Sequence, residues 1–138
     1  MLGVLVTFLV AGLNPSPAQA TNLRRRLYEL IERTRVQHGL PALHMDRNLS
    51  KYCRRHSLAM LQQNRLYHTT DLLGKVRRYN ANWWGENVGY AATPRRLRYL
   101  WMHSADHRAN LLNGHFHNIG IGVVQGRGWI WATTIFYG

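Results

Sequence analysis

Apolar residues recur three and four positions apart over residues 23–31, which predicts an amphipathic helix. Asn22 is a suitable N-cap residue for this helix, Gly39 suits its end, and Pro41 lies just beyond. Arginines occupy the other side of the predicted helix. The apolar positions are Leu23, Leu27, Leu30 and Ile31, and the arginines are Arg24, Arg25, Arg26, Arg33 and Arg35.

A second amphipathic helix is predicted from about residue 49, with Asp46 or Asn48 as its N-cap. Its apolar stripe includes Cys53, which we interpret as a small buried hydrophobe, and His56, which we interpret as a core or boundary histidine. Residues 64–82 have weak periodicity and predict a loop with short helical turns. The stripe consists of Leu49, Tyr52, Cys53, His56, Ala59 and Met60.

Short helices and a first strand are predicted in the middle of the chain. Residues 83–91 alternate as a strand does, and their glycines allow close approach of another backbone. Thr93 and Pro94 form a helix start, with proline at the first helical position. Ser104 is placed to cap a further short helix that ends near Asn113.

The last part of the chain is predicted to be a hairpin. Residues 119–124 and Trp129–Tyr137 are rich in β-branched and aromatic residues, and residues 125–128 contain the glycines of a tight turn. Trp129 and Trp131 share one strand face, so at least one face of that strand is expected to be buried. The order of elements predicts one α+β domain, a small antiparallel sheet covered by helices.

The beginning of the chain is predicted to be a signal peptide, residues 1–20. Residues 2–13 form an apolar run of about twelve residues, the length of a signal-sequence core and short of a membrane span. Ala18-Gln19-Ala20 matches a cleavage site. We therefore expect export, with a mature domain over residues 21–138 that is secreted or associated with the cell envelope and has no transmembrane span.

Composition limits the partners. The chain has 138 residues, a net charge of +12 and one cysteine, Cys53, which allows no intramolecular disulfide. A hydrophobic fraction of 46% is enough for a core, which argues against disorder. The positive charge favours anionic partners such as a polysaccharide or an envelope surface. Nucleic acid is disfavoured, because the chain is predicted to be exported and contains no reading helix.

One carboxylate stands out. Glu86 is the only acidic residue between Asp71 and Asp106. It forms either a structural ion pair with an arginine or part of a functional site. Histidines in the same half of the chain keep the second alternative open, because imidazole and carboxylate groups together suit zinc. These histidines are His68, the pair His103 and His107, and the pair His115 and His117.

Five short motifs in the chain resemble, in order and spacing, the bacterial branch of the CAP superfamily (cysteine-rich secretory proteins, antigen 5 and pathogenesis-related 1 proteins), whose domain is called the SCP domain. The motifs are RVQHGLPAL at residues 35–43, YHT at 67–69, GENVG at 85–89, WMHSADHRANLL at 101–112 and FHNIGIG at 116–122. The resemblance covers residues 23–137.

The resemblance implies an α-β-α sandwich with a central antiparallel sheet flanked by helices. It also implies a ligand-binding cleft in which two histidines and two glutamates of the family gather, and which binds zinc or another divalent cation in some members. His68, Glu86 and His107 match three of these positions and are the expected metal ligands. Ser104 stands where the second glutamate would be, which removes one carboxylate from the expected set. A further departure is Glu32, where the family often has asparagine.

Three functions follow as hypotheses. The first is a secreted, non-enzymatic binding protein whose cleft of His68, Glu86, Ser104 and His107 accepts a divalent cation or a polar or lipid ligand. The second is a hydrolase of peptides or glycans, in which Glu86 acts as general base on a water held by His68 and His107. The third is a basic adhesion domain that binds anionic envelope polymers.

Overall fold

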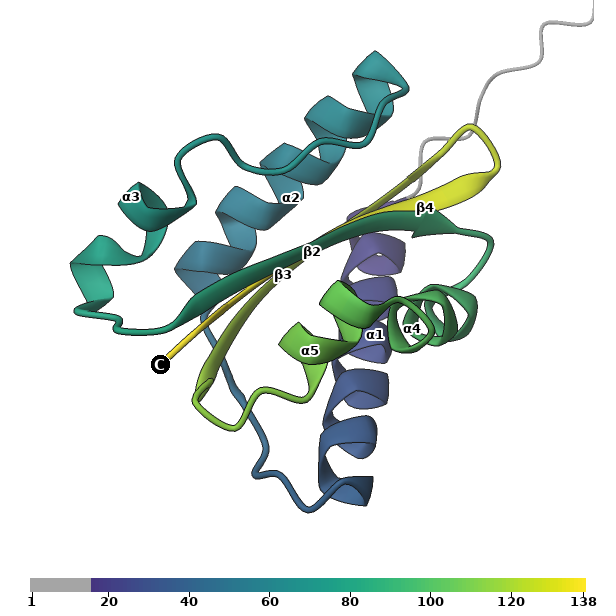
Figure 1. Ribbon diagram of the computed structural model, residues 1–138. Coiled ribbons are helices and arrows are strands. Elements are labelled where there is room, and N and C mark those ends of the chain that lie inside the picture. Colours follow the sequence, from purple (N-terminus) through teal and green to yellow (C-terminus); the bar gives the residue numbers. More distant parts are fainter. Residues whose placement is uncertain (1–15) are drawn as a thin grey trace, which may run out of the picture.

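The computed structural model describes residues 16–138 (Figure 1), so most of the predicted signal peptide lies outside the described residues. The elements in chain order are α1 (Pro17–Gln37), β1 (His44–Met45), α2 (Arg47–Gln63), α3 (Leu72–Val76), the 3-10 helix η1 (Arg77–Tyr79), β2 (Trp84–Ala91), α4 (Pro94–Met102), α5 (Ala105–Leu111), β3 (Asn118–Gly126) and β4 (Trp129–Tyr137).

A four-stranded sheet in the order β1-β3-β4-β2 forms the middle layer. The three long strands are antiparallel, while the two-residue β1 pairs parallel to β3, with His44 opposite Asn118. The predicted α+β class is confirmed, and the expectation of a purely antiparallel sheet is corrected by β1. A strand of two residues is too short to show a period of two in the sequence.

Helices cover both faces of the sheet (Figure 1), as a three-layer sandwich requires. Helices α1, α4 and α5 lie on one face, where Leu27, Trp101 and Phe116 join the largest apolar cluster. Helix α2 and the short α3 lie on the other face, where Leu49 and Met60 pack against strand residues. Within residues 16–138, no helix combines the length and the hydrophobicity that crossing a membrane requires.

The predicted helix start at Asn22 is wrong. Helix α1 begins at Pro17, and the Ser16 hydroxyl accepts a hydrogen bond from the Gln19 backbone N–H at 3.3 Å. Serine before a proline at the first helical position is a favourable N-terminus, so the helix extends beyond the cap expected at Asn22. The predicted end is confirmed, because Gly39 follows the helix with a φ of +72°.

Arg35 is the main departure on α1. The periodicity of the sequence predicted that Arg35 lies with the other arginines on the side away from the core. In the structure its side chain is completely buried. Its guanidinium donates hydrogen bonds to the carbonyl oxygens of Pro41, Leu111, Asn113 and Phe116 at 2.9–3.3 Å. Arg35 thus joins α1 to the end of α5 and to the loop before β3.

Asp46, one of the two candidate caps, is the N-cap of α2. Its carboxylate accepts hydrogen bonds from the backbone N–H groups of Asn48 and Leu49 at 2.8 and 2.9 Å, and from the Tyr137 hydroxyl at 3.0 Å. Burial alone raises the pKa of this carboxyl, but the hydrogen bonds outweigh burial and the pKa is lowered. The ionised form therefore stabilises the fold.

We expect Asp46→Ala to lower the free energy of unfolding by about 1 kcal/mol at pH 7, the usual cost of a lost N-cap. Because its pKa is lowered in the folded state, the Asp46 carboxylate stabilises the fold fully at pH values above its unfolded-state pKa of about 3.9. This stabilisation disappears as the pH falls through the folded-state pKa. The difference between variant and wild type should therefore shrink between pH 5 and pH 2 in urea denaturation. Asp106→Ala, at an exposed first-turn position of α5, is the control. An Asp46→Ala difference that stays constant with pH would contradict the assignment.

Candidate functional site

The candidate site lies along the edge strand β2, where side chains from both helical layers reach the same strand. Glu86 lies in the middle of β2 and points to the face that carries α2 and α3, while the neighbouring Asn87 points to the face that carries α5. Within residues 16–138, β2 is an edge strand of the sheet, so side chains from both helical layers meet at this edge.

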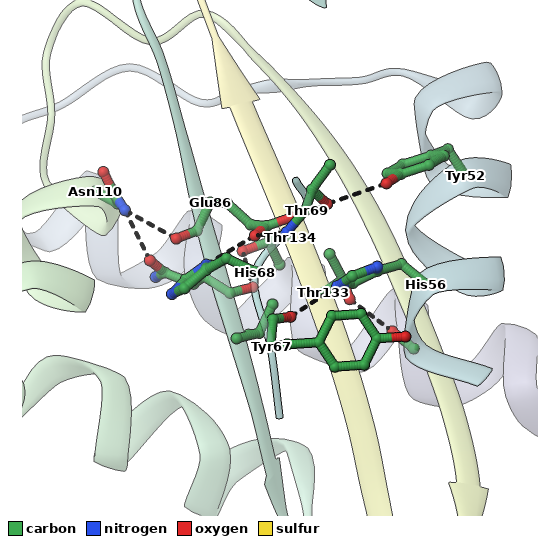
Figure 2. A network of polar contacts seen from close by, with 12 residues as sticks. Tyr52, His56, Tyr67, His68, Thr69, Glu86, Asn110, Thr133 and Thr134 are labelled. Atoms are coloured by element: carbon green, nitrogen blue, oxygen red, sulfur yellow. Dashed lines mark hydrogen bonds and ion pairs between the residues drawn. The ribbon is translucent and has the colours of Figure 1, made fainter. Parts of the chain in front are cut away.

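Glu86 is an almost completely buried carboxylate, with 2% of its side chain exposed. Its Oε1 accepts hydrogen bonds from His68 Nδ1 at 2.7 Å and from the Thr69 backbone N–H at 2.8 Å. Its Oε2 accepts a short hydrogen bond from the Thr69 hydroxyl. Figure 2 shows His68 and Thr69 converging on this carboxylate. Glu86 therefore holds the segment of the loop between α2 and α3 that carries His68.

His68 is the exposed member of the pair, with 62% of its side chain in contact with solvent. Because a carboxylate only accepts, the contact with Glu86 places the proton of the neutral imidazole on Nδ1. Nε2 then carries a lone pair. A buried acid that fixes one ring nitrogen while the other remains available is the usual way to prepare a histidine for a ligand.

Residues of α2 extend this network behind the site (Figure 2). The Tyr52 hydroxyl donates to the Thr69 hydroxyl oxygen at 3.1 Å. His56 Nε2 is hydrogen-bonded to the Tyr67 carbonyl at 2.8 Å, and its ring packs edge-on against the Tyr67 ring. The prediction of His56 as a core or boundary histidine is confirmed. Together these contacts fix residues 67–69, and with them the position of His68.

On the other side of β2, two asparagines attach α5 to the strand. Asn110 Nδ2 donates to the Glu86 carbonyl at 3.2 Å and to Asn87 Oδ1 at 2.9 Å. Asn87 Nδ2 donates to the His107 carbonyl at 3.0 Å. Gly85 is needed here, because a β-carbon at this position would overlap the Asn110 side chain. These bonds fix the backbone of His107 against the strand that carries Glu86.

His107 is half-buried, and its Nδ1 is hydrogen-bonded to the Ser104 hydroxyl at 2.8 Å. Ser104 occupies the predicted N-cap position of α5, but its hydroxyl contacts His107 and makes no capping bond to a backbone N–H. Burial lowers the pKa of His107, and the nearby His68 lowers it further when protonated. Burial thus favours the neutral form of His107, and His68 lies close enough to act on it electrostatically.

Two of the other candidate histidines, His103 and His115, make their contacts with aromatic residues outside this group. His103 ends α4, where its ring stacks on Tyr99 with 3.9 Å between centroids and its Nδ1 is hydrogen-bonded to the Tyr99 carbonyl. His115 stacks on Trp83 with 4.1 Å between centroids. His103 and His107 belong to two different helices, because the chain turns at Ser104. Cys53 is completely buried, and burial raises the pKa of its thiol, which confirms its interpretation as a small buried hydrophobe.

The three expected metal ligands do not form a ready-made metal site. Among the described residues, no three histidine, cysteine, aspartate or glutamate side chains are grouped so that they could hold a metal ion. Glu86 uses both carboxylate oxygens on His68 and Thr69, so its role here is to position His68. A cation at this site would depend on the imidazoles.

Comparison with known proteins identifies the family. The sequence model of the cysteine-rich secretory protein family, CAP, matches residues 22–136. The chain belongs to the CAP family. The resemblance found in the five motifs is thereby confirmed, and the matched span includes every residue of the site described above.

Two relatives of this CAP chain come from Bacillus subtilis. The uncharacterized protein YkwD of Bacillus subtilis is 31% identical over 124 residues, which cover 85% of this chain and 48% of YkwD. The uncharacterized membrane protein YlbC of the same organism is 27% identical over 111 residues, which cover 75% of this chain and 32% of YlbC. The chain thus spans half or less of the length of these two relatives.

Solved structures share the fold. An extracellular SCP-domain protein from Bacillus anthracis superposes with a TM-score of 0.74 at 24% identity, over 89% of this chain and 44% of that chain. A cysteine-rich secretory protein from Staphylococcus aureus gives a TM-score of 0.71 at 26% identity, over 88% and 40%. An outer surface protein of Borrelia burgdorferi gives 0.76 at 19% identity, over 91% and 97%.

Sequence reasoning gave no role to Thr69, Asn87 and Asn110, although all three lie inside the motifs. Thr69 satisfies Glu86 with both its N–H and its hydroxyl, and the two asparagines join α5 to β2. Their side chains act on residues 17–24 positions away in the sequence. The one signal in the sequence was their position near His68, Glu86 and His107 in the same motifs.

Proposed function

We propose that this CAP domain is an extracellular, non-enzymatic binding domain in which His68, with His107 beside it, binds a polar group of a ligand or a divalent cation. The observation that carries the proposal is the contact between the buried Glu86 carboxylate and the exposed His68 imidazole. Burying the Glu86 carboxylate costs desolvation free energy, and its contact with an exposed histidine adds no apolar packing to the core. This favours a role in binding.

Glu86 and Ser104 are positioning residues in this proposal. Glu86 holds Nδ1 of His68, and Ser104 holds Nδ1 of His107. Ser104 stands where the family resemblance places a second glutamate, so the hydroxyl keeps His107 oriented without adding a negative charge. The site then offers imidazole nitrogens and one buried carboxylate.

The hydrolase alternative receives less support from the same geometry. A general base must reach the proton that it removes, whereas both Glu86 oxygens accept hydrogen bonds from His68 and Thr69. Export is supported by the predicted signal peptide and by the extracellular and secretory relatives. The proposal places cleavage after Ala20.

Zinc calorimetry of the domain tests the proposal. We expect wild type to bind Zn²⁺ at pH 7.5, and His68→Ala to abolish the heat of binding. Glu86→Gln keeps the size of the side chain but can no longer accept all three hydrogen bonds. We expect it to weaken binding about tenfold, the lower end of the effect of removing an outer partner of a metal-bound histidine.

Glu29→Gln is the matched control, because it makes the same chemical change at an exposed position of α1 that contacts Arg25 at 3.8 Å. It should bind zinc as wild type does. A wild-type domain without any heat of binding would remove the cation from the proposal. Equal weakening in Glu29→Gln and Glu86→Gln would show that net charge, and not the site, determines binding.

A further inference from the structure

A hollow lined by aromatic rings lies at the end of the sheet where α2 stops. Helix α2 ends at Gln63, and Asn64 turns the chain away with a φ of +49°. The β3–β4 hairpin contacts the last turns of α2 through a hydrogen bond from Arg127 Nε to the Leu61 carbonyl at 3.2 Å, and both elements can be followed in Figure 1. A hollow of about 410 Å³ lies there, lined by Asn64, Arg65, Leu66, Tyr90, Trp129 and Trp131.

The rings form a connected aromatic wall. Tyr90 pairs with Trp131 across the two strands, and Trp129 lies two residues before Trp131 on the same face. The Tyr90 ring centroid is 4.7 Å from that of Trp131 and 5.8 Å from that of Trp129, at interplanar angles of 30° and 66°. Tyr90 and Trp129 are each 43% exposed. Their mutual packing fixes the rings before any ligand arrives, which lowers the entropy cost of binding.

Polar groups border the same hollow. Asn64 and Arg65 line it together with the aromatic rings. The Arg65 guanidinium lies 5.3 Å from the Tyr67 ring centroid, a cation–π contact that holds it beside the hollow. No acidic residue lines the hollow.

We propose that this hollow binds a sugar ring of a β-linked glycan. A pyranose with equatorial hydroxyls presents flat C–H faces, which pack on the electron-rich faces of tryptophan and tyrosine. Its hydroxyls accept hydrogen bonds from arginine and amide N–H groups. A wholly apolar ligand would make no use of Arg65 and Asn64, the polar side chains that line the hollow. The combination of aromatic faces and N–H donors therefore fits a saccharide better than a lipid chain.

The glycan hollow is separate from the His68 site. Tyr90 lies near the end of β2, whereas Glu86 lies in its middle, and none of the residues that line the hollow contributes to the Glu86 network. The inference therefore does not depend on the function proposed above. Either can fail without the other.

Titration with cellotetraose and with tetra-N-acetylchitotetraose, followed by tryptophan fluorescence and by the indole N–H signals in NMR, tests the inference. We expect saturable binding of at least one of the two probes at millimolar concentration or below, with shifts at Trp129 and Trp131. Trp129→Ala should weaken binding about tenfold or more, since it removes the most accessible stacking surface. The same variant should retain the wild-type circular dichroism spectrum, because Trp129 is exposed.

Trp83→Ala is the matched control, because Trp83 is 49% exposed and stacks on His115 at a different end of β2. It should bind the saccharide as wild type does. Binding of neither probe would overturn the inference, and so would equal weakening in Trp83→Ala. Binding to anionic phospholipid vesicles that Trp129→Ala abolishes, without saccharide binding, would overturn it in favour of a membrane contact.

Discussion

Arg35→Ala is expected to lower the free energy of unfolding by about 4 kcal/mol, which is a large share of the 5–15 kcal/mol available to a small domain. The guanidinium is completely buried and supplies hydrogen bonds to four carbonyl oxygens. Removing it leaves these carbonyls buried without donors, each at a cost of about 1–3 kcal/mol if no water replaces the lost bond. The cavity adds to that cost.

The position of the four carbonyls explains why the effect reaches the site. The Leu111 carbonyl lies at the end of α5, where helices have carbonyls without partners, and the Phe116 carbonyl lies in the loop before β3. Burial lowers the pKa of Arg35, while the neighbouring Glu32 raises it. Without the guanidinium, the end of α5 loses its attachment to α1, and the helix that carries His107 becomes less firmly held.

Urea denaturation followed by circular dichroism measures the effect. Arg33→Ala, an exposed arginine on the same helix, should change stability by less than about 0.5 kcal/mol. Arg35→Lys should be intermediate or equally poor, since an ammonium group cannot reach four carbonyls in the planar geometry of a guanidinium. If Arg35→Ala does not fold, Arg35→Lys provides the measurement. If both variants lower the free energy of unfolding by less than about 1 kcal/mol, then Arg35 does not hold α1 to the end of α5 as described above.

Gly122→Ala is expected to lower the free energy of unfolding by at least about 3 kcal/mol, the upper range for overpacking. A β-carbon on Gly122 would overlap backbone atoms of Cys53 and Arg54 in α2. Backbone atoms of a helix cannot move aside as the end of a flexible side chain can, so α2 as a whole would have to shift. The Ser57 hydroxyl, which donates to the Gly122 carbonyl at 3.1 Å, would lose its position as well.

Gly114→Ala is the matched control for this substitution. A β-carbon on Gly114 would find its nearest neighbour, Leu40 Cδ2, at 3.6 Å, which is an ordinary van der Waals distance. This variant should be within about 0.5 kcal/mol of wild type, or slightly more stable. Thermal and urea unfolding compare the two. If Gly122→Ala is as stable as Gly114→Ala, then the close contact of α2 with β3 is not a requirement of the fold.

The sequence predicted which residues form the candidate site better than it predicted what each of them does there. His68 and Glu86, 18 positions apart, were expected in one cleft, and the structure brings them into contact at 2.7 Å. Their use as metal ligands stays a prediction. What the motifs did not indicate is that Glu86 is saturated by His68 and Thr69. The number of hydrogen bonds to a buried carboxylate depends on the loop that folds over it, and the sequence pattern does not describe that loop.

The sequence by itself determined the presence and order of the long helices and strands of this CAP domain, the end of α1 before Gly39 and the α+β class, and it narrowed the cap of α2 to Asp46 or Asn48. These features depend on residues close together in the chain, on their period and on their capping groups. Only the tertiary structure decided that Arg35 is buried, that Gly122 lies under the α2 backbone and that β1 pairs with β3. Each of these depends on atoms far away in the sequence, because a buried polar group is stabilised only by the partners that the folded chain brings to it.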